Sequence, residues 1–343
     1  MKIGILTLPF NINYGGILQC YALCTYLKKQ GHEPIVLQRE AISTVKKWIR
    51  MVLCKVGLFK YVDKSYEVGK LIFPFLTEHL NCTQVVNTTQ KMQRQCRRCC
   101  LDAVLVGSDQ VWRREFALKF GFDNFLEFVP SDIPKLSYAA SFGLSEWEYT
   151  PTETACIKNL LTGFKGISVR EEEGVSLCAE HLDIKAQWHV DPTLLLEAKD
   201  YEKVASPRLV QEKYVFVYWL GDESVIAPVL KKYEEGGLRV CQISLRSNNY
   251  LPSVGDWLSY IKHAEMVVTD SFHGIVFSMI FNRPFHVFCN QAGGFGRVRS
   301  LFKALQIEHK INDGDAPLNY MALNERIKTL RAEADGYLRE VLI

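Results

Sequence analysis

The residues best suited to chemistry lie in one short corner at positions 270–274, with the sequence Asp-Ser-Phe-His-Gly. An apolar run precedes the corner, and an apolar stretch with helical spacing follows it. This order predicts a strand, a polar turn and a helix. In a parallel sheet such turns lie at the carboxyl edge of the strands, where ligands bind and helix amides attract anions. The imidazole of a histidine can donate or accept a proton, so His273 is suited to moving protons or to holding a phosphate.

A purely structural interpretation of this corner also remains open. Ser271 could simply cap the helix, and His273 could be a structural imidazole. Asp270 could orient the imidazole, act as a second acid, or cap the helix itself.

Two further polar corners follow predicted strands in the first half of the chain, at residues 11–16 and 108–112. The amides of two adjacent glycines could bind an anion, and amide side chains suit sugar hydroxyls. Trp112 could offer a saccharide an aromatic platform, or it could be a core tryptophan beside a helix cap. The loop at 11–16 has neither a G-x-G-x-x-G nor a P-loop pattern, which argues against nucleotide binding. The candidate acceptor-binding residues are Asn13, Tyr14, Gly15, Gly16, Gln19, Ser108, Asp109, Gln110 and Trp112.

Several segments, taken in order, resemble the polysaccharide pyruvyl transferase family, and together they span most of the chain. Besides the corner at 270–274, they are Asn13-Tyr14-Gly15-Gly16 with Gln19, Val106-Gly107-Ser108-Asp109-Gln110-Val111-Trp112, Tyr138-Ala139-Ala140-Ser141-Phe142-Gly143, Ser168-Val169-Arg170-Glu171 and His189-Val190-Asp191-Pro192-Thr193. Each motif is short, but their common order makes the resemblance specific.

The resemblance implies an enzyme that takes the pyruvyl group of phosphoenolpyruvate and attaches it as a cyclic ketal to a hexose of a capsule or exopolysaccharide precursor. It implies a saccharide acceptor, which we expect to be linked to undecaprenyl diphosphate. Phosphoenolpyruvate would be a co-substrate, and we expect no other cofactor and no metal.

Phosphoenolpyruvate carries a phosphate and a carboxylate, so its site needs cations and backbone hydrogen-bond donors. Arginine binds either anion bidentately and stays charged. The resemblance directly supports Arg170, which follows a predicted strand, and His273. Arg297 and Arg299 follow a glycine-rich loop at 293–296. The predicted catalytic residues are His273, Asp270 and Arg170. The predicted phosphoenolpyruvate-binding residues are Arg170, Ser271, His273, Gly274, Arg297 and Arg299.

The sequence leaves two other functions open. The chain could be a glycosyltransferase that uses a nucleotide sugar, or a catalytically silent saccharide-binding protein. The sequence has no segment that resembles a pocket for a nucleotide base or ribose, which argues against the glycosyltransferase. The intact Arg170 and His273 argue against the silent binding protein.

Composition limits the class of protein further. The formal net charge of +3 over 343 residues is too small, and too dispersed, for a nucleic-acid-binding protein. The sequence has no apolar run long enough to span a membrane, and its start does not resemble a signal peptide, so we expect a cytoplasmic protein. The 11 cysteines are scattered, as is typical of reduced thiols. Cys96, Cys99 and Cys100 form one C-x-x-C step, for which we favour helix packing over a zinc site.

The pattern of apolar residues predicts two Rossmann-like α/β domains that face each other across a cleft, with mostly parallel sheets, similar to the glycosyltransferase-B type. We expect an acceptor-side domain at 1–195 and a phosphoenolpyruvate-side domain at 196–343, whose final helix packs back on the first domain. The predicted strands are at 2–7, 34–37, 102–107, 135–140, 166–169, 214–219, 238–244, 265–269 and 284–288. The predicted helices are at 16–30, 152–162, 171–180, 223–235, 254–263, 272–281, 298–305 and 320–340.

The segment 43–70 has a different composition. Seven lysines and arginines are interleaved there with aromatic and aliphatic residues, and the only acids are Asp63 and Glu67. This composition is typical of a helix that lies on an anionic membrane surface. It also fits an amphipathic helix packed on the sheet with a solvated lysine face, which is the interpretation we favour. A lipid-linked acceptor would favour peripheral contact with the inner face of the membrane.

Overall fold

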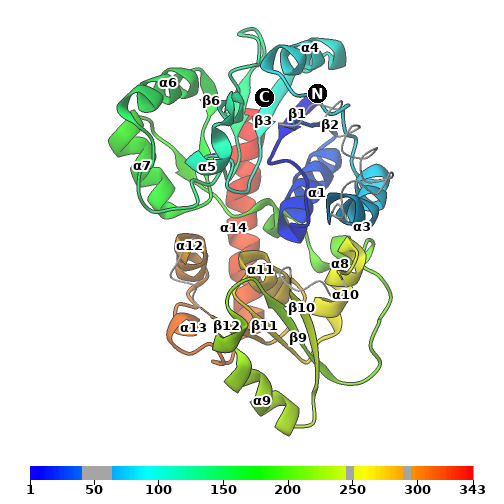
Figure 1. Cartoon of the computed structure of the whole chain (residues 1–343). Helices are drawn as coiled ribbons and strands as arrows, with labels where there is room; N and C mark the ends of the chain where they lie inside the picture. Colours follow the sequence, from blue (N-terminus) through cyan, green and yellow to red (C-terminus); the bar gives the residue numbers. More distant parts are fainter. Residues whose placement is uncertain (41–63, 245–250, 289–294, 343) are drawn as a thin grey trace, which may run out of the picture. The chain divides into compact units, whose positions relative to one another are not determined.

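The computed structural model describes residues 1–40, 64–244, 251–288 and 295–342 (Figure 1). The chain divides into two units, residues 1–192 with 336–343 and residues 193–335. Each unit is built on a parallel sheet with helices between the strands. The predicted α/β class with parallel sheets is therefore confirmed.

The main sheet of the first unit is parallel, in the order β2-β1-β3-β5-β6. Its strands are β1 (Lys2–Leu6), β2 (Glu33–Leu37), β3 (Ala103–Val106), β5 (Lys135–Ser137) and β6 (Phe164–Gly166). The helices of this unit are α1 (Tyr14–Lys29), α3 (Lys64–His79), α4 (Thr89–Cys99), α5 (Arg114–Ala117), α6 (Pro151–Thr162) and α7 (Glu172–Leu182). The smaller elements are β4 (Lys119–Phe122), η1 (Asp123–Phe125), and the parallel pair β7 (Ser168–Val169) and β8 (Gln187–Trp188).

Local sequence explains the first strand-helix-strand unit. Asn13 caps α1, and Lys28 and Lys29 in its last turn complement the negative end of the helix dipole. Gly31 follows the helix with a φ of +82°, a conformation that glycine adopts without strain. The next strand, β2, then pairs with β1 along its whole length.

One predicted strand is divided in the structure. The segment 166–169 does not form a single strand, because β6 pairs with β5 whereas β7 pairs with β8. The register shifts between Lys135 and Leu136, and Ala140 then bridges to Val169. The prediction was wrong here because a change of pairing partner leaves no mark on apolar periodicity.

The second unit contains a parallel sheet in the order β10-β9-β11-β12. Its strands are β9 (Tyr214–Trp219), β10 (Arg239–Ser244), β11 (Met266–Thr269) and β12 (Phe285–Val287). Its helices are α8 (Ala198–Glu202), α9 (Ala227–Glu235), α10 (Val254–His263), α11 (Phe272–Ile280), α12 (Phe295–Leu305) and α13 (His309–Asn312), with the short turns η2 (Pro192–Leu195) and η3 (Glu223–Val225) beside them.

The last helix, α14 (Tyr320–Val341), contributes its residues from Gly336 onward to the first unit. There the hydroxyl of Tyr337 donates a hydrogen bond to the carbonyl of Ser137 at 2.8 Å. The assignment of an acceptor side and a phosphoenolpyruvate side to the two domains stays a prediction.

Over the described residues, no helix is both long enough and apolar enough to cross a bilayer. Most of the basic segment at 43–70 lies outside the described residues, which resume at Lys64 with α3. The predicted membrane contact of that segment stays a prediction.

Candidate functional site

The corner after β11 has the predicted order of strand, turn and helix. Ser271 is the N-cap of α11, and its Oγ accepts the amide of Gly274 at 3.4 Å. Oγ1 of Thr269 accepts the amide of Ser271 at 3.1 Å and donates to the carbonyl of Tyr218 at 2.7 Å. These bonds fix the start of the helix at the carboxyl edge of β11.

Glycine at position 274 permits close contact between this helix and the end of the strand. A Cβ there would lie only 2.5 Å from Oγ1 of Thr269. Any larger residue would have to push the start of α11 away from β11. Gly274 therefore sets the position of the amides that face the corner.

His273 and Arg297 both contact the ring of Phe272. The rings of His273 and Phe272 meet edge to face, with centroids 5.2 Å apart. The guanidinium carbon of Arg297 lies 5.6 Å from the centroid of the same ring, within the range of a cation–π contact. The structure thus brings Ser271, His273 and Arg297 together around the start of α11.

Asp270 and Arg299 make other contacts. Oδ1 of Asp270 accepts the amide of Leu220 at 2.9 Å and so links the loop after β9 to the corner. The residue that caps α11 is Ser271, so the alternative in which Asp270 caps the helix is wrong. The guanidinium of Arg299 lies over the ring of Phe295 at 5.3 Å. The chemical roles of Asp270 and Arg299 stay predictions.

In the first unit, Asn13 joins the start of α1 to the corner after β3. Its Oδ1 accepts the amide of Gly16, and its Nδ2 donates to Oδ2 of Asp109, each at 3.1 Å. Asp109 has a φ of +77°, and such strain, on the order of 1–3 kcal/mol, is typical of functional corners. Asn13, Gly16 and Asp109 border a cavity of about 30 Å³. This space fits roughly one water or one hydroxyl group.

Trp112 does not offer a platform to a saccharide. Its side chain is fully buried, stacks on Phe125 with centroids 5.7 Å apart, and donates through Nε1 to the carbonyl of Asn124 at 3.1 Å. The prediction of a sugar platform is wrong, because the aromatic core of this unit covers the ring. The alternative, a core tryptophan, is confirmed.

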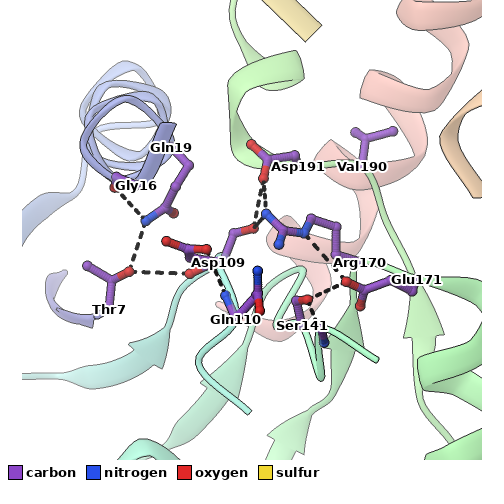
Figure 2. Close-up of polar contacts among 12 residues, drawn as sticks. Thr7, Gly16, Gln19, Asp109, Gln110, Ser141, Arg170, Glu171, Val190 and Asp191 are labelled. Atoms are coloured by element: carbon purple, nitrogen blue, oxygen red, sulfur yellow. Dashed lines mark hydrogen bonds and ion pairs between the residues drawn. The ribbon is translucent and has the colours of Figure 1, made fainter. Parts of the chain in front are cut away.

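Gln19 is also directed into the protein (Figure 2). Its Nε2 donates to Oγ1 of Thr7 and to the carbonyl of Gly16, both at 2.9 Å. The acceptor-binding candidates that are buried are Tyr14, Gly15, Gln19, Ser108, Asp109 and Trp112. Those with surface in solvent are Asn13, Gly16 and Gln110. Gln19 therefore supports the loop, and a direct contact with a sugar is not expected from this geometry.

Arg170 lies in a buried network with acids on neighbouring segments (Figure 2). Its Nη1 is 2.7 Å from Oδ2 of Asp191 and donates to Oγ of Ser108 at 3.3 Å. Ser108 in turn donates to the same carboxylate at 2.9 Å. Burial alone would lower the pKa of Arg170, but the nearby carboxylates of Asp191, Glu171 and Asp109 outweigh it and raise the pKa overall. The guanidinium is thus a fixed charge inside the first unit.

A second acid, Glu171, extends this network. Nε of Arg170 lies 3.9 Å from Oε1 of Glu171, which also accepts a short hydrogen bond from the hydroxyl of Ser141. The amide of Gly143 donates to that hydroxyl at 3.0 Å. Arg170 and its acids therefore hold together the corners that follow β3, β5, β7 and β8.

Asp191 was missed as a site residue, although its motif was recognised. The sequence nevertheless contained a pattern that predicts the pairing of Asp191 with Arg170. Arg170 follows β7 and Asp191 follows β8, and the ends of two parallel neighbours lie at the same edge of a sheet. Opposite charges at adjacent strand ends predict an ion pair.

Among the described residues, no group of three or more His, Cys, Asp or Glu side chains is arranged to hold a metal. Cys96 is buried on α4, and burial raises the pKa of its thiol to about 12. Cys99 is half-buried and Cys100 is exposed. The helix-packing interpretation of this cysteine group therefore accounts for Cys96.

Comparison with known proteins identifies a family and a fold. The model of a family described as polysaccharide pyruvyl transferase matches residues 13–291. No curated protein matches the sequence.

Among solved structures, a protein assigned as a UDP-N-acetylglucosamine 2-epimerase from Listeria monocytogenes aligns with a TM-score of 0.53 at 10% identity, over 95% of this chain and 90% of that one. An α-glucosyltransferase solved with UDP and a 13-mer DNA aligns with a TM-score of 0.50 at 8% identity, over 99% of each chain. At such identities the likeness shows the fold alone, which is of the glycosyltransferase-B type.

Proposed function

The chain belongs to the polysaccharide pyruvyl transferase family, and from this premise we propose that it transfers the pyruvyl group of phosphoenolpyruvate to a hexose of a cell-surface polysaccharide precursor. The product is a cyclic ketal, and phosphate is released. The observation that carries the proposal is the convergence of Ser271, His273 and Arg297 at the start of α11.

The start of α11 is suited to an anion with two charged groups. The amides at the start of a helix and the positive end of its dipole attract negative charge. Arg297 beside Phe272 supplies a permanent cation, and His273 supplies one when it is protonated. We assign the phosphate and the carboxylate of phosphoenolpyruvate to this set of donors.

The reaction needs one proton donor and two proton acceptors. A proton is added to the methylene carbon, and the first sugar hydroxyl forms a bond to the central carbon as it loses its own proton. The bond from that carbon to the phosphate oxygen then breaks, and phosphate leaves with the bonding electron pair. A second hydroxyl adds to the same carbon, loses its proton and closes the ketal. The imidazole of a histidine can both donate and accept a proton, and we assign one of these transfers to His273.

The acceptor side is assigned to the corner of Asn13, Gly16, Asp109 and Gln110 in the first unit. Its small cavity holds one hydroxyl-sized group beside the Asp109 carboxylate and the Asn13 amide. We further propose that the acceptor is linked to undecaprenyl diphosphate, and that the basic segment 43–70 holds the enzyme at the membrane that carries it.

Titration calorimetry with phosphoenolpyruvate tests the donor site. Arg297→Ala should weaken binding by the 1.5–3 kcal/mol typical of a hydrogen bond to a charged group, which is about 10-fold to 150-fold. The matched control is Arg239→Ala, because Arg239 begins β10 at the opposite edge of the same sheet, where its side chain is 59% exposed. If the wild type and both variants bound phosphoenolpyruvate with equal affinity, the assignment of Arg297 to the donor site would be contradicted. Tight binding of a nucleotide sugar, with none of phosphoenolpyruvate, would favour a glycosyltransferase instead.

A further inference from the structure

A cavity of about 280 Å³ in the first unit has no role in the chemistry described above. It lies beyond the carboxyl ends of β1 and β2 and is bounded on one side by α3. Its walls are mainly aliphatic and aromatic. The buried side chains of Val36, Leu37, Ile72 and Leu76 form its inner part, and Phe73, which is 60% exposed, stands on its border.

The buried charged residue that lines this cavity, Arg39, already has an ionic partner. Nε of Arg39 lies 2.8 Å from Oδ2 of Asp123, and both side chains are buried. The guanidinium carbon of Arg39 also lies 4.9 Å from the centroid of Phe120. An ion pair of this kind does not attract a further anion, so the cavity suits an uncharged, apolar group.

The cavity shares a wall with the proposed acceptor corner. Residues 8–11 line both the apolar cavity and the small polar cavity beside Asn13, Gly16 and Asp109. A molecule with a polar head and an apolar tail would therefore meet both environments along the same loop. Glu40, which precedes the basic and aromatic segment 43–70, and Gly69, which lies near the end of that segment, also line the apolar cavity.

We propose that this cavity binds the first part of an apolar chain carried by the saccharide acceptor. The chain is an isoprenoid or an alkyl chain, and the identity of the molecule that carries it rests on the proposed function. An apolar cavity of about 150 Å³ holds one benzene, so this cavity has room for roughly ten carbon atoms.

The test is a calorimetric titration with glucosides of increasing chain length, each below the concentration at which it forms micelles. Affinity should rise on the order of tenfold or more from methyl to octyl glucoside, and should gain little beyond a chain of about ten carbons. Geranyl and decyl glucosides distinguish an isoprenoid from a straight chain. An affinity that is independent of chain length would overturn the proposal, as would a rise that continues unchanged past this length.

Two variants locate the binding. Leu8→Trp should fill the cavity, and Phe73→Ala should remove its exposed border. In each variant, most of the increase in glucoside affinity with chain length should be lost. Met321→Ala is the matched control for Phe73→Ala, because Met321 is 79% exposed and lies in the second unit. Unchanged octyl glucoside affinity in both cavity variants would overturn the proposal. Because the titration uses no phosphoenolpyruvate and no turnover, its failure would leave the proposed pyruvyl transfer untouched.

Discussion

Nη1 of Arg170 lies 2.7 Å from Oδ2 of Asp191, and the two side chains are 1% and 0% exposed. Arg170 was predicted to touch phosphoenolpyruvate, but in the structure its charge is engaged inside the first unit. Because breaking a buried ion pair leaves one charge uncompensated, this pair makes the fold of the site sensitive to either partner.

Arg170→Ala should lower the free energy of unfolding by about 3–5 kcal/mol, because Asp191 would remain buried and charged. Urea denaturation measures this loss. Arg170→Met combined with Asp191→Leu should recover part of it, since both charges of the pair are then removed while the nearby Glu171 stays charged. If Arg170→Ala instead kept full stability and lost only phosphoenolpyruvate affinity, the buried pair would be dispensable and Arg170 would be a ligand, as the sequence suggested.

Trp112→Phe tests whether this tryptophan belongs to the core or to the saccharide site. The variant loses the hydrogen bond to Asn124 and leaves a small cavity, so stability should fall by about 1–3 kcal/mol. The KM for the acceptor should stay unchanged, because the ring is fully buried. A raised acceptor KM at unchanged stability would restore the platform interpretation.

The elements that carry the predicted chemistry were recognisable from sequence. The run before Asp270 forms β11, and the stretch after it forms α11, because a buried strand, a polar cap and an apolar helix each leave a distinct local pattern. The cap was placed correctly at Ser271 as one of two alternatives.

What the sequence could not supply was the environment of each side chain. Trp112 follows a strand, as a ligand-binding residue often does, but the rings that cover it, such as Phe125, come from elements whose packing no local pattern reveals. The same holds for Arg170, whose partner Asp191 is 21 residues away along the chain. Long-range contacts decide whether a polar residue is a ligand or a support.

His189 should make the stability of the first unit depend on pH. Burial lowers the pKa of this imidazole from its ordinary value of 6.5 to about 4. The unfolded chain therefore takes up a proton near pH 6.5, whereas the folded protein stays neutral at this site. The lowered pKa of His189 therefore contributes on the order of 3 kcal/mol to the free energy of unfolding above about pH 6.5. This contribution is lost as the pH falls towards 4.

Urea denaturation at pH 7 and pH 4.5 measures this dependence. Between these pH values, the free energy of unfolding of the wild type should fall by about 2 kcal/mol more than that of His189→Gln. The glutamine cannot titrate, but it can still form a hydrogen bond with Ser168. Equal losses in the two proteins would show that other groups control the acid sensitivity.

The basic segment 43–70 should bind anionic membranes. Each lysine near such a surface contributes on the order of 1 kcal/mol, and salt screens this attraction. In a sedimentation assay, the protein should be found in the pellet with anionic vesicles at low salt and in the supernatant at high salt. With neutral vesicles, little protein should be found in the pellet.

Replacing Lys46, Lys47 and Arg50 by glutamate should abolish this binding. The same replacement at Lys158, Lys165 and Lys185 gives a control with equal net charge, because these exposed lysines lie elsewhere in the first unit. Equal loss in the two triple variants would mean that net charge, and not this segment, directs the protein to the vesicle.

The most direct test of pyruvyl transfer follows the carbon atoms of phosphoenolpyruvate labelled with ¹³C. The enzyme is incubated with lipid-linked saccharides and hexose glycosides, and the saccharides are then analysed by mass spectrometry and NMR. Pyruvyl transfer by this enzyme predicts labelled pyruvate in an acid-labile ketal, one phosphate released for each label transferred, and a rate about two to four orders of magnitude lower for His273→Asn. Phosphate release with no label in any saccharide, or an equal rate in wild type and variant, would contradict it.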